Sequence, residues 1–332
     1  MEKEILKFLQ EKGKVTTKEL VEYFKKDRTT IYRWLKKLED AGKIEVLKKG
    51  TYQIKESLEQ YFSTPTWERK KANYNPDFLR NYKPNKTYFF SENNLQKLQN
   101  STLDLPIDTD FYKTNKRFLE TLLIDLTFAS SYLEGNTYSY LDTEVLLKYN
   151  EINKEKTQEE TQMILNHKKA IEYMIYYKKD LDFNKNTFSE IHTLLGDKLL
   201  LKNDLGIIRN KIVEIGGSTY TPLENKYRLE EEFELFLEKL NLIKNPFEQS
   251  LFIMVFIPYF QLFLDINKRT SRIMCNLPLI KNNLPVLSLI QLEKKKYIIG
   301  ILSVYELNNF DLLQNIWTEN YLLNLEKYKK YF

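Results

Sequence analysis

The sequence predicts a mainly α-helical protein that begins with a small module containing a β-hairpin. Charged residues make up 29% and hydrophobic residues 42% of the 332 positions, and only 9 are glycine, so the apolar content is sufficient for ordered cores. Apolar side chains recur at helical spacing along most of the chain after residue 105. Period-two alternation after residue 44 predicts one hairpin, and a second hairpin is expected to interrupt the later helices.

The first 55 residues are predicted to form three helices followed by the hairpin. Thr16 and Glu19 form a capping box at the start of the second helix, and Asp27 is a candidate N-cap for the third. Apolar residues of the third helix follow the i, i+3, i+4, i+7 pattern at Ile31, Trp34, Leu35 and Leu38. After Gly42 the period changes to two on both sides of a turn at residues 48–50.

Three helices and such a hairpin resemble the winged helix-turn-helix domain, in which the third helix enters the DNA major groove. The resemblance implies that base edges face Arg28, Thr29, Tyr32 and Arg33, and that phosphates contact Lys36, Lys48 and Lys49. The charge distribution agrees, because these 55 residues hold 15 Lys and Arg against 9 Asp and Glu, whereas the whole chain holds 51 against 46. A solvated basic face, or a winged helix used for protein contact, is the alternative. A homodimer is compatible with this domain, since winged helices often read paired half-sites.

The domain organisation follows from a change of composition. Residues 1–55 are the winged helix, and residues 105–332 are a helical domain. Residues 56–104 lack clear periodicity but are rich in aromatic residues, Asn and Pro, so this connecting segment is expected to pack on the helical domain, with Pro76 and Pro84 fixing turns. Helices are predicted at 115–134, 141–151, 157–178, 187–200, 226–242, 247–260, 269–283, 291–306 and 309–329.

Two predicted helix ends carry charges that oppose the helix dipole. Asn267 is a candidate N-cap, followed by Lys268, Arg269 and Arg272 in and after the first turn. Free N–H groups and these cations form a good anion site, and Asp265 just before them could bind a divalent cation that bridges phosphates. Each charge alone is better read as a solvated surface group, but the set predicts a phosphate-binding site.

The complementary end is the C-terminus of the helix before Gly135, whose last turn carries Glu134. A carboxylate is disfavoured at this position of a helix. A pair between Glu134 and Arg272 would relieve both unfavourable charges and would occupy the place of an outer phosphate.

Residues 261–272, QLFLDINKRTSR, resemble the Fic motif of the Fic/Doc (Fido) family, and Ser130 to Glu134 and Gly135 resemble that family's N-terminal inhibitory motif. Residues 211–223, KIVEIGGSTYTPL, resemble the β-hairpin flap that holds a target peptide, here through Gly217, Ser218, Thr219 and Tyr220. The expected fold is therefore a Fic-type helical bundle with a β-hairpin flap after the winged helix. The resemblance implies that ATP is bound with Mg²⁺ at Asp265, with inner phosphates at Asn267 and Arg269, and with the γ-phosphate at Arg272. It also implies that Glu134 is an autoinhibitory plug.

The sequence departs from the family at the catalytic position. Family members transfer AMP to a target hydroxyl with the motif histidine as general base, but this position is Gln261, and an amide does not accept that proton near pH 7. His167 and His192 are not placed by the motif to replace it. Ile266 and Lys268 stand where most members have glycine, and Asn-Lys-Arg is the form found in Doc toxins, which phosphorylate their target.

The predicted function is a nucleotide-binding regulator that joins a DNA-binding winged helix to a degenerate, autoinhibited AMP-transfer site. The alternative is an active protein adenylyltransferase, or a Doc-like phosphotransferase, and a third option is a scaffold that binds neither ligand. One cysteine and two histidines argue against a zinc site. The N-terminus is charged and the longest apolar run, 251–264, is too short to span a bilayer, so a cytoplasmic protein without a membrane partner is expected.

Overall fold

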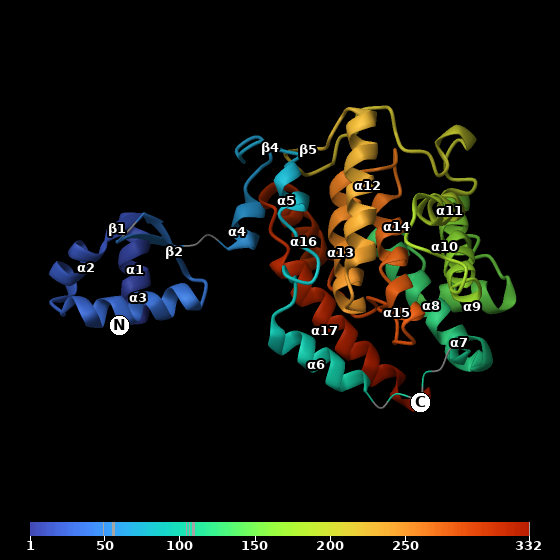
Figure 1. The fold of residues 1–332 in the computed structure, drawn as a ribbon, viewed down its shortest axis with the longest axis horizontal. Coiled ribbons are helices and arrows are strands. Elements are labelled where there is room, and N and C mark those ends of the chain that lie inside the picture. Colours follow the sequence, from blue (N-terminus) through green and yellow to red (C-terminus); the bar gives the residue numbers. More distant parts are fainter. Residues whose placement is uncertain (49, 55–56, 104, 106, 108–109, 332) are drawn as a thin grey trace. The chain divides into compact units, whose positions relative to one another are not determined.

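The computed structural model describes residues 1–48, 50–54, 57–103, 105, 107 and 110–331 (Figure 1). The chain divides into two compact units, Met1–Arg69 and Lys70–Phe332. The sequence places its domain boundaries at 55/56 and 104/105; residues 55, 56 and 104 lie outside the described ranges, so those limits stay predictions.

The first unit contains helices α1 (Glu2–Lys12), α2 (Thr17–Phe24), α3 (Arg28–Asp40) and α4 (Leu58–Ser63) and strands β1 (Lys14–Thr16), β2 (Ile44–Lys48) and β3 (Thr51–Ile54). The predicted caps are confirmed: Thr16 and Glu19 form the capping box of α2, and Asp27 Oδ1 accepts the N–H of Thr30 at 2.9 Å. The hairpin of β2 and β3 is confirmed as well. Strand β1, which was not predicted, adds to β3 in antiparallel register and gives the sheet order β1-β3-β2.

The core of the first unit joins all three predicted helices to the sheet. Its buried side chains are Ile5, Phe8, Leu9, Val15, Leu20, Ile31, Leu35, Leu38, Ile44 and Tyr52. The helical spacing of the apolar residues therefore marks the faces that are buried, and the basic side chains of α3 stay on the outside.

The second unit is almost entirely helical. Its helices are α5 (Pro76–Arg80), α6 (Glu92–Thr102), α7 (Phe111–Thr114), α8 (Lys116–Leu133), α9 (Tyr140–Tyr149), α10 (Gln158–Tyr176), α11 (Lys185–Gly196), α12 (Lys226–Leu242), α13 (Pro246–Phe260), α14 (Asn267–Met274), α15 (Leu277–Lys281), α16 (Lys294–Leu307) and α17 (Asp311–Tyr328). Two short strands, β4 (Ala72–Asn73) and β5 (Tyr220–Thr221), pair in parallel, and the turns Lys202–Asp204 and Lys329–Tyr331 are 3₁₀ helices.

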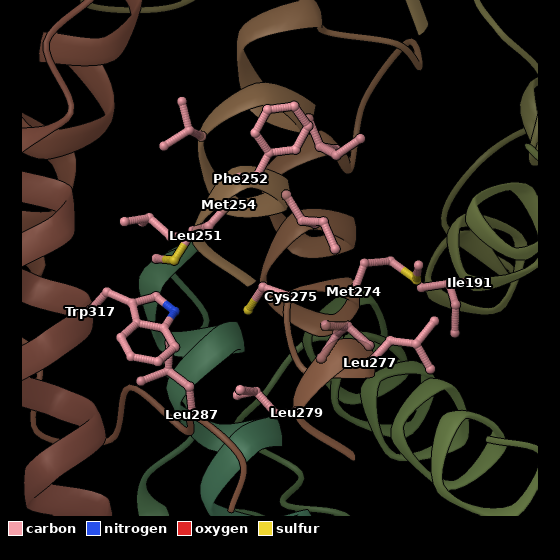
Figure 2. Close-up of a cluster of buried hydrophobic side chains, with 14 of the residues drawn as sticks. Ile191, Leu251, Phe252, Met254, Met274, Cys275, Leu277, Leu279, Leu287 and Trp317 are labelled. Carbon is pink, nitrogen blue, oxygen red and sulfur yellow. The ribbon is translucent and has the colours of Figure 1, made fainter. Parts of the chain in front are cut away.

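Helix α13 is the central helix of this unit, and every residue from Phe247 to Phe260 is buried. Its near-continuous apolar sequence suits a helix that is covered on all sides. Figure 2 shows part of this packing, with Leu251, Phe252 and Met254 near Met274, Cys275, Leu277, Leu279, Leu287 and Trp317. The few polar groups of α13 are satisfied, since Ser250 Oγ accepts the indole N–H of Trp317 at 3.0 Å. The C-terminal end of α13 is therefore held by a packed core.

Residues 70–103 belong to the second unit and pack on its helices. Leu79, Tyr82, Phe89, Phe90 and Leu98 are buried in the same core as α13. The backbone N–H groups of Phe89 and Phe90 both donate to the buried carboxylate of Glu248, at 2.9 and 3.0 Å. An aromatic segment without periodicity is thus ordered by tertiary contacts rather than by its own helix propensity.

One predicted helix is two helices. The sequence predicts a helix over 269–283, but α14 ends at Met274 and α15 begins at Leu277. Pro278 lacks an N–H and its ring would clash with the carbonyl group of residue 274 in a continuous helix. Asn276 fills the break, because its side-chain amide donates to Arg272 O at 3.1 Å.

The predicted β-hairpin at 211–223 requires a correction. Gly217 has a φ of 76° in a turn where the N–H of Ser218 donates to Ile215 O at 3.1 Å, so the turn is present. Within the described residues, however, β5 pairs with β4 and not with the arm before the turn. The physical reason is that Glu306 accepts Ser218 Oγ and the Thr219 N–H, at 2.8 and 3.0 Å, and holds the second arm toward β4.

Candidate functional site

The loop between α13 and α14 is fixed by two unusual backbone positions and one asparagine. Gln261 ends α13 with φ 50°, and Ile266 precedes α14 with φ 65°, both in the left-handed region. Asn267 Oδ1 accepts the Phe263 N–H at 2.9 Å, and Asn267 Nδ2 donates to Phe263 O at 2.8 Å. Asn267 is therefore not the N-cap that the sequence predicts: Ile266 takes that position without a side-chain cap, and the Asn267 amide closes the loop instead.

Arg272 points from α14 to the end of α8 and is 2% exposed. Its guanidinium donates to Ser130 Oγ at 3.0 Å, to Ser130 O at 3.1 Å and to the Tyr297 hydroxyl at 3.1 Å. The guanidinium also donates to Glu134 Oε1 at 2.8 Å. The predicted pair between Glu134 and Arg272 is thus confirmed as a contact, and it is a buried, charge-assisted one.

Glu134 is ionised in this environment. Burial raises the pKa of a carboxyl group, but Arg272 and Lys268 outweigh that effect and lower the pKa of Glu134 to about 2. Lys268 Nζ lies 3.4 Å from Glu134 Oε2, so the carboxylate bridges the two cations. Glu134 itself is the C-cap of α8, where its negative charge is stabilised by these partners rather than by the helix.

Arg269 is the least satisfied cation of the site. It is 7% exposed, its Nε has no hydrogen-bond partner among the described residues, and its NH2 lies 3.4 Å from Asp265 Oδ2. Burial lowers the pKa of Arg269, and the carboxylates of Asp265 and Glu134 oppose that shift. A buried guanidinium with an unused donor favours a further anionic ligand.

Ser130 is held by His167, an interaction that sequence reasoning missed. His167 Nδ1 lies 2.8 Å from Met163 O, so Nδ1 carries the proton and Nε2 accepts from the Ser130 hydroxyl at 2.9 Å. That hydroxyl then has its lone pairs free to accept from Arg272. Burial lowers the pKa of His167 to about 3, which keeps the ring neutral and this donor order fixed.

The amide of Gln261 is fully engaged. Nε2 donates to Pro258 O at 2.8 Å and to the Tyr305 hydroxyl at 3.0 Å, and Oε1 accepts from Asn267 Nδ2 at 3.2 Å. His192 lies close by, stacked on Phe263, but Gly206 N–H donates to its Nδ1 and its Nε2 donates to Asp265 O. Burial lowers the pKa of His192 to about 4, so it is a neutral ring with both nitrogens in use.

A cavity of about 390 Å³ lies over these residues. It is lined by Glu134, by the loop residues 264–268, by residues 213–216 before the flap turn, and by α16 through Tyr297, Ile301 and Tyr305. Sequence reasoning did not assign the α16 side chains, because their spacing reads as ordinary helix packing. The cavity brings together Asn267 and Lys268 of the predicted phosphate-binding set, the predicted metal ligand Asp265, Glu134 and the first arm of the flap, whereas Arg269, Arg272 and the predicted docking residues 217–220 do not line it.

The family comparisons agree with this geometry. The family model described as Fic/DOC family matches residues 182–279. The chain contains a Fic/DOC domain. A second family model, described as bacterial regulatory protein of the arsR family, matches residues 3–46, so the Fic domain is combined with an ArsR-type helix-turn-helix.

Solved structures with Fic domains have the same fold at low sequence identity. Fic-1 from C. elegans (residues 134–508) is 18% identical with a TM-score of 0.58, over 72% of this chain and 71% of that one. A Fic domain containing signaling protein from Bacteroides thetaiotaomicron is 17% identical with a TM-score of 0.56, over 70% and 94%. A Fic family protein from Desulfovibrio desulfuricans is 15% identical with a TM-score of 0.61, over 75% and 77%. The search of curated proteins found no match.

The flap of the Fic domain is fastened by residues that the sequence did not indicate. Arg209 is 4% exposed and donates to Gln261 O, to Lys211 O at 2.9 Å and to Leu223 O at 2.7 Å. It therefore ties both ends of the flap to the motif loop. A buried arginine outside any motif has no sequence signal beyond its charge.

The four predicted docking residues differ in accessibility. Gly217 is exposed, and Ser218 and Thr219 are half-buried against Glu306. Tyr220 is 3% exposed, stacks between Tyr259 and Tyr305 and donates to Tyr259 O at 2.8 Å. Tyr220 thus anchors the flap, and its side chain is not accessible to a target peptide.

The predicted DNA-facing side chains lie on the outside of the helix-turn-helix unit. Exposed positions include Arg28, Thr29, Tyr32, Arg33 and Lys36 on α3 and Lys48 on β2. Tyr32, a large aromatic residue, is 54% exposed. Lys49 lies outside the described residues. The described face combines cations with aromatic and hydroxyl groups, which is typical of a nucleic-acid-binding surface.

Proposed function

We propose that this protein is a DNA-binding regulator whose Fic domain binds ATP with Mg²⁺ at a degenerate AMP-transfer site held closed by Glu134. The observation that carries the proposal is the buried contact of Glu134 with Arg272, because both residues stand at the matching positions of two separate family motifs.

The charge of the pocket supports an anionic ligand. Lys268, Arg269 and Arg272 face two carboxylates, Glu134 and Asp265, so removing Glu134 leaves two uncompensated positive charges. The N-terminal turn of α14 has no side-chain cap and its dipole adds to this field. A triphosphate could therefore take over the partners of Glu134, with Arg272 binding the outermost phosphate.

The residues fit Mg²⁺ as a partner of the nucleotide. The side chain of Asp265 is 66% exposed. Its Oδ2 atom lies 3.4 Å from the NH2 group of Arg269, which is a long contact. Across the described parts of the chain, no group of three or more His, Cys, Asp or Glu could hold a metal ion. One carboxylate together with phosphate oxygens is the common arrangement for Mg²⁺, which supplies charge neutralisation at the phosphates. Asp265 would hold it, and Asn267 and Arg269 would orient the inner phosphates.

The absence of a general base at position 261 supports ATP binding without rapid AMP transfer. Gln261 uses its amide in three hydrogen bonds, and an amide does not take a proton from an alcohol near pH 7. Burial raises the pKa of the neighbouring Tyr305 hydroxyl, so it is not a base either. Loss of a general base typically costs a factor of about 10²–10⁴, so ATP binding can persist where transfer is slow.

The DNA half of the proposal is supported by the ArsR-type helix-turn-helix and by the exposed basic face of α3. Affinity for a duplex should fall steeply with salt, because phosphate contacts release counterions. Within the described residues, no helix is long and apolar enough to cross a membrane.

The deciding experiment is calorimetric titration of Mg²⁺–ATP into wild type, Glu134→Gln and Glu214→Gln. Glu214 is exposed and lines the same cavity, so its variant removes the same charge without releasing Arg272. We expect Glu134→Gln to tighten ATP binding by about tenfold or more, a gain of about 1.4 kcal/mol, and Glu214→Gln to change it far less. Absence of binding in all three proteins would reject the ATP site, and equal effects of the two variants would reject the plug.

A second function is an active transferase that modifies a protein hydroxyl. Its support is that the sequence retains Asp265, Asn267, Arg269 and Arg272, of which Asp265 and Asn267 line the cavity, together with the Asn-Lys-Arg order of the Doc form. ATP labelled at the α-phosphate or at the γ-phosphate distinguishes adenylyl from phosphoryl transfer in the Glu134→Gln variant. Label on neither the protein itself nor a lysate would reject this alternative.

A further inference from the structure

A second cavity, of about 510 Å³, lies between α8, α10 and the C-terminal end of α9. It shares no lining residue with the candidate nucleotide pocket, and its volume is within the range of about 300–1,000 Å³ that is typical of small-molecule sites. We propose that this cavity binds an aliphatic carboxylate, with the carboxylate at Lys113 and Lys116 and the hydrocarbon chain on an apolar floor. Binding at this cavity does not depend on the proposed function.

The cavity lies where α9 stops covering the pair formed by α8 and α10. These two helices run antiparallel, since His167 contacts Ser130 near one end of the pair and the Lys178 ammonium lies over the ring of Tyr112 near the other. Helix α9 packs on them through a small buried cluster and ends before Asn150, whose φ is 56°. All lining residues of the cavity come from α7, α8, α9 and α10, which lie together on one side of the second unit (Figure 1).

The floor of the cavity is aliphatic. It is lined by four branched side chains, each between 3% and 9% exposed: Leu119, Leu123, Ile124 and Leu147. Tyr149 and Tyr176 also line the cavity and are more exposed. Each methylene group that leaves water on such a floor adds favourable transfer free energy, whereas the hydroxyl groups of a sugar would lose their hydrogen bonds there. The floor therefore fits an alkyl chain better than a nucleoside.

The charged part of the lining is mainly basic, with four lysines against two glutamates. Two of the lysines already have partners. Lys148 Nζ pairs with Glu144 at 2.7 Å, and Lys168 Nζ donates to Leu147 O at 3.4 Å, close to the C-terminus of α9. The end of the cavity at α9 is therefore electrostatically satisfied, and it suits the uncharged end of a ligand.

The opposite end, at the start of α8, favours an anion. Among the described residues, the ammonium groups of Lys113 and Lys116 have no hydrogen-bond or ion-pair partner. Helix α8 begins at Lys116 and has no acidic residue in its first turn, so its dipole adds to their positive charge. Glu120, one turn further along α8, offsets one of the two cations. The remaining single positive charge matches a carboxylate better than a doubly charged phosphate.

Calorimetric titration of the full chain without nucleotide tests this site with three matched probes. We expect one octanoate to bind per chain. Butyrate, which has the same carboxylate and a shorter chain, should bind at least about tenfold more weakly because it leaves the floor exposed. Octanol, which has the same chain and no charge, should bind at least about fivefold more weakly, whereas a merely apolar surface would bind octanol at least as tightly as octanoate.

Charge reversal locates the carboxylate. Lys116→Glu and Lys113→Glu change exposed side chains on two different helices, and each should weaken octanoate binding about fivefold or more while octanol binding stays the same. Arg117→Glu is the matched control, because it reverses the same charge at the next position of α8, is exposed and does not line the cavity. It should change the Kd for octanoate less than about twofold.

Loss of octanoate affinity in both lysine variants, with the affinity kept in Arg117→Glu, would support the site. Three results would each reject it: no octanoate binding to wild type, octanol binding as tight as octanoate binding, or equal effects of Lys116→Glu and Arg117→Glu.

Discussion

Gln261 stands at the position where the Fic motif has its histidine, and the proposed function assigns slow group transfer, but not loss of nucleotide binding, to this change. The left-handed backbone at this position and the surrounding network of Pro258, Tyr305 and Asn267 are built around an amide with two donors and one acceptor. Of the proposed phosphate-binding residues, Asn267 donates to this amide at 3.2 Å, whereas Lys268 and Arg272 contact Glu134 instead. Under the proposed function, the residue at position 261 limits group transfer, and the neighbouring cations bind the nucleotide.

Restoring an imidazole at this position should restore transfer. In the Glu134→Gln background we expect Gln261→His to raise the rate of label transfer from α-labelled ATP by about 10²–10⁴, because a ring nitrogen with a pKa near neutrality can accept the hydroxyl proton. Gln261→Asn is the control, since it keeps an amide. Equal label in both variants would mean that the base is not what limits the reaction.

A second residue-scale prediction concerns Glu248, whose carboxylate holds Phe89 and Phe90 in the core. Burial raises the pKa of Glu248 to about 7, against the opposing effect of the two N–H donors. With an unfolded pKa near 4.5, the native state favours the protonated form, so this contribution to stability is complete below pH 4.5 and is lost as the pH rises through 7.

The consequence is measurable as a difference in pH slope. Between pH 4.5 and 8 the free energy of unfolding of wild type should fall by about 3 kcal/mol relative to Glu248→Gln, from about 1.4 kcal/mol per pKa unit. Urea unfolding followed by tryptophan fluorescence provides the measurement, and Glu234→Gln, which removes an exposed carboxylate on α12, provides the control. Parallel slopes for wild type and Glu248→Gln would contradict the assignment.

At the scale of elements, the candidate site is formed by charged residues at the ends of two helices. The C-terminus of α8 and the N-terminus of α14 each carry a charge that opposes the helix dipole, and each supplies the partner of the other. The proposed function requires an anionic ligand to take the place of Glu134 at this junction. In helix α3 the charged side chains are instead left without such partners at a helix end: its apolar face is buried in the core of the first unit, and its basic face is exposed.

The basic face of α3 gives the element-scale prediction. Arg33→Ala should weaken duplex binding and reduce the slope of log K against log salt by about one phosphate contact. Lys7→Ala on the exposed side of α1 removes the same charge from another helix of the unit and should change the slope less. Anisotropy titrations at several salt concentrations measure both slopes, and identical losses would indicate non-specific attraction rather than binding through α3.

At the scale of the whole molecule, the division into two compact units predicts two separable unfolding transitions. Mg²⁺–ATP should stabilise only the transition of the Fic-domain unit, by about 2.7 kcal/mol when free ATP is 100 times its Kd. Differential scanning calorimetry with and without ATP measures this, and the shift should be larger in Glu134→Gln at the same ATP concentration. A shift confined to the smaller transition would place the nucleotide on the wrong unit.

Sequence patterns predicted the elements whose signals are local. The caps at Thr16 and Asp27, the wing, most helices of the second unit and the pairing of Glu134 with Arg272 were all readable, because each depends on spacing or on a charge at a helix end. The roles of these residues in binding remain predictions. The position of Asn267 was misread, since its loop-closing bonds to Phe263 involve a left-handed Ile266 that no local rule indicates.

The sequence by itself determined that this chain joins a basic helix-turn-helix to a Fic domain and that Gln261 stands at the position where the Fic motif has histidine, since these features are carried by residue identity and order. Only the tertiary structure decided that β5 pairs with β4, that Arg209 ties the flap to the motif loop, and that His167 and Ser130 orient Arg272. Those contacts join residues far apart in sequence, and their partners are chosen by packing and by the need to satisfy buried polar groups, which no local pattern encodes.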